Sequence, residues 1–115
     1  MANIYTNSKV DLTNTSETVV YTSPAAGTST TATTSIIKSI LVSEDSGNAD
    51  SITLTLTDTS SNVFSLFKTK AVSANGTVEL LTHPLVITEG EVIKATAATG
   101  NRLHILFSVL QITRD

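Results

Sequence analysis

The sequence predicts one all-β domain, a two-sheet antiparallel β-sandwich of about eight strands. Short segments alternate apolar and polar residues, which is the period of a strand with one buried face. Turn-forming residues separate these segments at spacings near ten residues. No segment keeps apolar residues at helical spacing over three turns. The pattern fits a jelly-roll and an immunoglobulin-like strand order equally, so both stay open.

The clearest strand covers residues 51–57, where Ile and Leu alternate with Ser and Thr. The strand over residues 102–113 repeats this alternation with larger apolar residues. Side chains that share one face of a strand pack together against the opposite sheet. We therefore expect the space between the sheets to bury Ile52, Leu54, Leu56, Ile105, Phe107 and Val109.

The other segments follow in order along a single domain, residues 1–115. Further strands are predicted over residues 9–13, 18–22, 35–43, 63–69, 76–82 and 91–97. Residues 1–8 mix Ile4 and Tyr5 with polar residues ahead of the first strand, and we interpret them as an extended arm that contacts a neighbouring subunit. Residues 23–34 are small and of low complexity, which predicts a long loop.

Two strands, 35–43 and 102–113, carry apolar residues on both faces. A sandwich strand needs only one apolar face, so the second must be covered within the chain or by another subunit. Both covers stay open. With the two apolar residues of the arm, the uncovered set predicts an oligomer or lattice contact made by Ile4, Tyr5, Ile37, Leu41, Leu106, Leu110 and Ile112.

The composition argues against several partners. The net charge is −3 and the 7 basic residues are scattered, whereas nucleic-acid binding needs clustered Lys and Arg. No apolar run approaches the length of a membrane span, and the first residues do not have the pattern of a signal peptide. Roughly three residues in ten are Ser or Thr, and only 15% are charged. Such a sheet surface is typical of one that lies against other protein.

Catalytic chemistry is not indicated. The chain has no Cys, and neither of its 2 His residues, His83 and His104, has a second ligand at zinc spacing. A Gly-x-Ser-x-Gly elbow and a glycine-rich phosphate loop are both missing. Residues 44–50 hold three carboxylates and an Asn, but without the register of a calcium loop, so an ordinary solvated turn is favoured. We expect no enzyme activity, metal or cofactor.

The order of the segments is similar to that of a known family. The chain runs through Tyr21-Thr22-Ser23-Pro24, a strand over 36–42, a segment over 85–97 with the turn Gly90-Glu91, and an ending over 103–112. This order resembles the small β-sandwich virion proteins of tailed bacteriophages, especially those of marine and cyanobacterial phages. The resemblance covers almost the whole chain, although the family more often has Gly-Asp at the turn.

The resemblance implies a structural virion component without enzymatic activity, which decorates or cements the capsid or attaches to the neck or tail. Its partners would be capsid or tail proteins, and it would be made in the host cytoplasm. We expect a homo-oligomer, and analogy with decoration and fibre proteins suggests a trimer. The alternative is a receptor- or carbohydrate-binding fibre or tail module, because β-sandwiches often serve as lectins. Against it, the sequence contains no Trp and only 2 Tyr for a sugar platform.

Overall fold

The computed structural model describes residues 2–24 and 32–114, and these contain nine strands and no helix. β-Branched and aromatic residues suit a pleated surface that is buried on one side. In chain order the strands are β1 (Ala2–Leu12), β2 (Thr18–Thr22), β3 (Ala32–Glu44), β4 (Asp50–Thr57), β5 (Val63–Val72), β6 (Thr77–Glu79), β7 (Leu85–Ile87), β8 (Val92–Ala97) and β9 (Leu103–Arg114). Every strand except β7 contains part of a segment predicted above.

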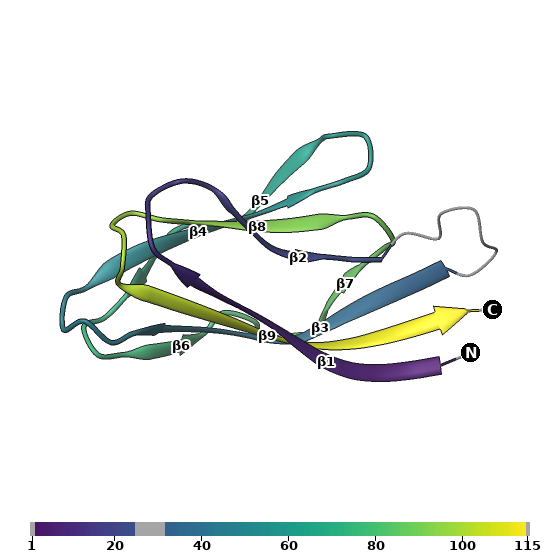
Figure 1. Cartoon of the computed structure of the whole chain (residues 1–115), viewed down its shortest axis with the longest axis horizontal. Helices are drawn as coiled ribbons and strands as arrows, with labels where there is room; N and C mark the ends of the chain where they lie inside the picture. The colour runs from purple at the N-terminus through teal and green to yellow at the C-terminus, as the bar shows by residue number, and fades with distance from the viewer. Residues whose placement is uncertain (1, 25–31, 115) are drawn as a thin grey trace.

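The strands form two antiparallel sheets that pack face to face as a β-sandwich (Figure 1). The five-stranded sheet has the order β1-β9-β3-β6, with β7 also paired to β3, and the four-stranded sheet has the order β2-β8-β4-β5. Consecutive strands such as β1 and β2, or β8 and β9, therefore lie in different sheets. This winding is the jelly-roll order, and it excludes the immunoglobulin-like order, in which the first two strands share a sheet.

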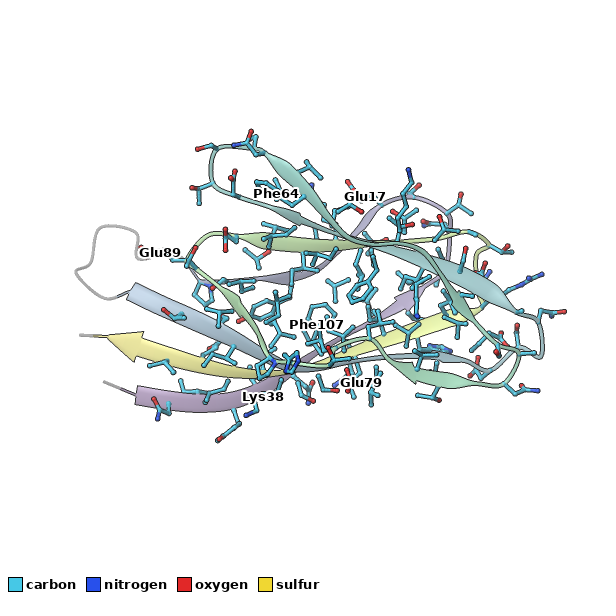
Figure 2. The ribbon with its side chains drawn as sticks, turned by 180° about the vertical axis from the view of Figure 1, so that it is seen from behind. Glu17, Lys38, Phe64, Glu79, Glu89 and Phe107 are labelled. Atoms are coloured by element: carbon cyan, nitrogen blue, oxygen red, sulfur yellow. The ribbon has the colours of Figure 1, made fainter. Side chains whose placement is uncertain are left out.

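The core lies between the sheets, as the alternation predicts. Ile52, Leu54, Ile105, Phe107 and Val109 are all at most 1% exposed. Leu56 is half-buried and packs against this cluster. Figure 2 shows Phe107 in the middle of the layer, between the two sheets. The predicted core is therefore confirmed for five of the six residues, and Leu56 is partly buried.

A β-bulge in β3 changes which side chains face the core. Ile37 lies opposite Val109, and the next pair along the ladder joins Ser39 to Ser108, so that Lys38 is an extra residue. The bulge shifts the alternation by one, and both Ile37 and Ile40 point inward with no exposed area. The prediction that Ile37 belongs to an external contact is therefore wrong.

The N-terminal segment differs from the predicted arm. Residues 2–8 continue β1 and pair with β9 without a register shift, from Ala2 opposite Thr113 to Leu12 opposite Leu103. Figure 1 shows these ends of β1 and β9, with the start of β3, projecting together beyond the four-stranded sheet. Their backbone hydrogen bonds make them part of the sheet, which a free arm would not be.

Other strand and loop boundaries also differ from the predicted ones. β3 begins at Ala32, so the predicted loop over 23–34 is shorter at its end, and residues 25–31 lie outside the described part of the chain. The predicted strand over 76–82 narrows to β6, and Leu80, just beyond it, is only 6% exposed. The short strand β7 was not predicted, since three residues give too little alternation to recognise.

Candidate functional site: the outer face of the five-stranded sheet

The side of the five-stranded sheet that faces away from the core carries an apolar row across four strands. Directly opposite residues in an antiparallel ladder point to the same side. Tyr5 of β1 lies opposite Leu110 of β9, Leu110 lies opposite Ile36 of β3, and Ile36 lies opposite Val86 of β7. Tyr5 is 76% exposed and Val86 57% exposed, while the two residues between them are half-buried. This Tyr5–Val86 row is the most exposed apolar feature of the sheet.

A second apolar pair lies further along the same face. Leu106 of β9 is opposite Leu41 of β3, and both are half-buried. Lys9 of β1 is opposite Leu106, and Glu79 of β6 is opposite Leu41, so charged groups flank the pair at each side. The apolar face therefore has a polar border, as the contact surfaces of proteins usually do.

The structure brings together most of the predicted contact residues. Leu41, Leu106, Leu110 and Ile112 all belong to the outer face, and Tyr5 joins them from β1. Ile4 does not, because it lies opposite Gln111 on the inner side of the sheet. It is nevertheless 49% exposed, since this end of the sheet projects beyond the other one.

Ile36 and Val86 complete the row, and sequence reasoning missed them. Ile36 is adjacent to Ile37, and without the bulge the alternation assigns the two residues to the wrong sides. Val86 lies in the unpredicted strand β7. The only local signal for Val86 was its position between two other apolar residues, Leu85 and Ile87.

A hollow of about 530 Å³ lies beside the Leu41–Leu106 pair and contains the imidazole of His104. The Nδ1 atom of His104 is 3.2 Å from Asp11 Oδ1, and its Nε2 atom is 3.1 Å from Asp45 Oδ1. A neutral imidazole donates only one hydrogen bond, whereas the protonated ring donates to both carboxylates. His104 thus links β9 to β1 and to the turn after β3, and all three side chains are exposed.

Glu79 holds the bulged part of β3 from the outer face. Its carboxylate accepts hydrogen bonds from the Ser39 hydroxyl, from the Ile40 N–H at 2.7 Å and from the Leu81 N–H at 3.2 Å. Figure 2 shows Glu79 and Lys38 on the side of the sheet away from Phe107. The carboxylate occupies the edge of β3 between β6 and β7, where the Ile40 N–H would otherwise lack a strand partner. Glu79 is therefore a structural residue.

Glu44 is a buried carboxylate that joins two turns. Its oxygens accept from the N–H and hydroxyl of Ser46, from the Gly47 N–H at 3.1 Å and from the Asn75 N–H at 3.0 Å. Burial would raise the pKa of Glu44, but these hydrogen bonds outweigh it and lower the pKa to about 2. The carboxylate is thus fully engaged by the chain itself. This gives the acidic segment 44–50 a structural explanation that sequence reasoning missed.

A buried network of polar side chains connects the two sheets near the projecting end. The Tyr21 hydroxyl of β2 is 2.7 Å from Ser35 Oγ of β3 and accepts from Gln111 Nε2 of β9 at 2.8 Å. Ser23 Oγ is 2.9 Å from Ser35 Oγ. Every hydroxyl in the group has a partner, which is the condition for a buried network to stabilise the fold.

Comparison with known proteins adds no family. No protein-family model matches the chain, and no curated protein matches it. Within residues 2–24 and 32–114, no three His, Asp or Glu side chains are placed to hold a metal ion. The same residues include no helix long and apolar enough to cross a membrane.

Proposed function

We propose that this chain is a structural component of a bacteriophage virion that has no enzymatic activity and binds capsid or tail proteins through the outer face of its five-stranded sheet. The observation that carries the proposal is the Tyr5–Val86 row. Exposed apolar side chains are ordinary when scattered singly, but an apolar row across four strands with an exposed side chain at each end marks an interaction surface.

The composition of the row supports a protein partner. Tyr is among the residues that contribute most to protein interfaces, because its large ring is rigid and its hydroxyl keeps a hydrogen bond. Leu110 and Ile36 give the row a half-buried centre, Lys38 lies beside Tyr5, and Lys9 and Glu79 flank the neighbouring Leu41–Leu106 pair. An apolar centre with a charged border can exclude water on contact and still orient the partner.

The placement of this surface in the virion rests on similarity. The order of segments resembles small β-sandwich virion proteins of tailed phages, and the jelly roll is a common fold of viral capsid proteins. A fold hosts many functions, so this support is an analogy.

The direct test is the composition of purified particles. Quantitative mass spectrometry of density-gradient-purified phage from the source culture should detect this chain in a fixed ratio to the major capsid protein. Treatment with 1 M NaCl should leave the chain attached, because apolar burial barely responds to screening. A chain that remains in the lysate and is absent from every particle fraction would contradict the proposal.

The second candidate is a carbohydrate-binding fibre or tail module, and one observation favours it. A hollow of about 470 Å³ beside the exposed Tyr5 ring is lined by Asn7, Lys38 and Ser108. An aromatic ring next to amide and hydroxyl groups is a suitable platform for a sugar. A glycan array would show selective binding that Tyr5→Ala abolishes, whereas a purely structural protein would bind no glycan selectively.

A further inference from the structure

β1 is the outermost strand of the five-stranded sheet, and its outer edge pairs with no other strand among the described residues. It is 11 residues long, contains no Pro and runs against β9 without a bulge. Residues 2–8 also carry no charged side chain. A long, regular and uncharged edge is a ready template for pairing with another strand.

The other described edges have features that oppose such pairing. β5 has two register shifts against β4, exposes Lys68 and Lys70, and places Thr69 at a φ of 53°. β2 is 5 residues long and has a register shift of its own. β6 and β7 contain 3 residues each. Bulges, edge lysines and short strands are the usual protections of a sheet edge, and the first seven residues of β1 have none of them.

The direction of the free backbone groups of β1 follows from its last residue. The Leu12 carbonyl accepts a hydrogen bond from the Asn101 N–H at 2.9 Å, so it points toward β9. Successive residues of a strand point their N–H and C=O groups to alternate edges. The even-numbered residues therefore bond to β9, and the odd-numbered residues from Asn3 to Asp11 direct their N–H and C=O groups outward.

We propose that β1 pairs antiparallel with β1 of a second copy of this chain, about a two-fold axis at Asn7, so that the two five-stranded sheets become one continuous sheet. In this register residue 7 is opposite residue 7 of the second copy, and all residues from 2 to 12 find a partner. The outward-pointing residues form the hydrogen-bonded pairs, each of which exchanges two backbone hydrogen bonds.

The side chains of β1 complement one another in this register. On the outer face, Asn3 meets Asp11 of the second copy, and Tyr5 meets Lys9, an arrangement that places an ammonium group against an aromatic ring. On the inner face, Ile4 meets Val10 of the second copy. This contact covers Ile4, which is 49% exposed in the single chain although it lies on the core side of the sheet.

Neighbouring registers are less favourable. Centring the axis on Lys9 or Asp11 places like charges directly opposite each other, which destabilises a strand pair. Centring the axis on Thr6 or Ser8 is also less favourable, because it leaves one end of β1 unpaired. The register centred on Asn7 is the one that uses the whole strand without a like-charge pair.

The pairing is independent of the virion role. Across Lys9, it would bring each Tyr5–Val86 row into line with the Leu41–Leu106 pair of the second copy, which makes a larger surface for any partner. It also commits the oligomer to a dimer, because a two-fold axis between identical edges closes after two copies. The trimer suggested by analogy is therefore an alternative that the mass measurement can distinguish.

The first experiment combines solution mass with cross-linking. Sedimentation of the full chain at tens of micromolar should give a dimer. Because the protein has no Cys, Asn7→Cys introduces a single thiol that would lie opposite its own copy, roughly 5.5 Å away between Cα atoms, within disulfide range. Mild oxidation should convert most of this variant to a covalent dimer. The control is Lys9→Cys, whose copies would be roughly 14 Å apart and should cross-link at least tenfold more slowly.

The second experiment uses proline at adjacent positions. Asn7→Pro removes an outward N–H and leaves the β9 ladder intact, so it should give a folded monomer. Thr6→Pro removes an N–H that bonds to β9, so it should lower the thermal stability. A monomeric or trimeric wild type, equal cross-linking of the two cysteine variants, or an Asn7→Pro variant that remains a dimer would each overturn the proposal. Absence of the chain from phage particles would contradict only the virion role and would not affect the proposed pairing of β1 with β1.

Discussion

The outer faces of the two sheets are covered by different residues, although both sheets contribute to the same core. On the four-stranded sheet, Thr53 lies opposite Thr96, and Thr55 lies opposite Lys94. The equivalent positions of the five-stranded sheet form the Tyr5–Val86 row and the Leu41–Leu106 pair. Thr suits a pleated surface, and the Thr53 hydroxyl accepts a hydrogen bond from the Thr69 N–H at 3.0 Å, so polar and charged side chains cover β4 and β8 on this face. The comparison favours the five-stranded sheet as the contact face.

Both sheets pack on the same core, and a substitution in that core should cause the largest loss of stability. Phe107→Ala deletes a fully buried ring between the sheets, so it should lower the free energy of unfolding by about 3–5 kcal/mol. Urea unfolding followed by circular dichroism measures this loss. A loss below about 1 kcal/mol would mean that the sheets do not depend on the packing of this ring.

The next largest effect should come from the polar connection between the sheets. Tyr21→Phe removes the hydroxyl that Ser35 and Gln111 share, and leaves their buried polar groups short of a partner. The expected cost is about 1–3 kcal/mol. Combining it with Ser35→Ala in a double-mutant cycle should show a loss smaller than the sum of the two single losses. Simple additivity would contradict the network.

A third effect should be confined to acid. Since the pKa of Glu44 is lowered to about 2, from an ordinary value of 4.5, its ionised form stabilises the fold above about pH 4.5. That contribution is lost as the pH falls toward about 2. Glu44→Gln should therefore flatten the decline in melting temperature over this interval. An unchanged pH profile in the variant would contradict the assigned hydrogen bonds.

The smallest change in stability is expected for a matched pair of exposed valines, one on each outer face. Val86 of β7 is 57% exposed and Val19 of β2 is 50% exposed. Val86→Asp and Val19→Asp should each change stability by less than about 0.5 kcal/mol. Binding to phage particles that lack the chain should nevertheless weaken about tenfold for Val86→Asp and remain unchanged for Val19→Asp. Equal effects of the two substitutions would remove the distinction between the faces.

The sequence predicted the parts of the fold that depend on alternation within one strand. Ile52 and Leu54 could be assigned to the core because their own neighbours show which side is apolar. The same reasoning assigned Leu106 and Leu110 correctly to the outer face. It failed at Ile37, because a bulge is a property of two strands and only β9 reveals it.

Contacts between distant segments could not be predicted. Residues 1–8 were interpreted as an arm because they mix Ile4 and Tyr5 with polar residues ahead of the first predicted strand, and the β9 partner of residues 2–8 lies at the other end of the described chain. In the sequence Glu44 has the pattern of an ordinary solvated acid, because its partner Asn75 belongs to a different turn. β7 is a strand only because β3 continues beyond β6 and offers it an edge. Each of these features requires the three-dimensional pairing.

The pairing of β1 with β9 also determines the order in which the molecule can form. β1 leaves the ribosome first among the described strands, but its only strand partner is the last of them to be made. Non-local pairing of this kind slows folding, because the entropy of closing a long loop is lost before the contacts form. Until then neither edge of β1 has a strand partner, and the side chains of Ile4 and Tyr5 are exposed. During this interval β1 could pair wrongly with another nascent chain. Conditions that keep nascent chains apart should therefore favour pairing of β1 with β9 of its own chain.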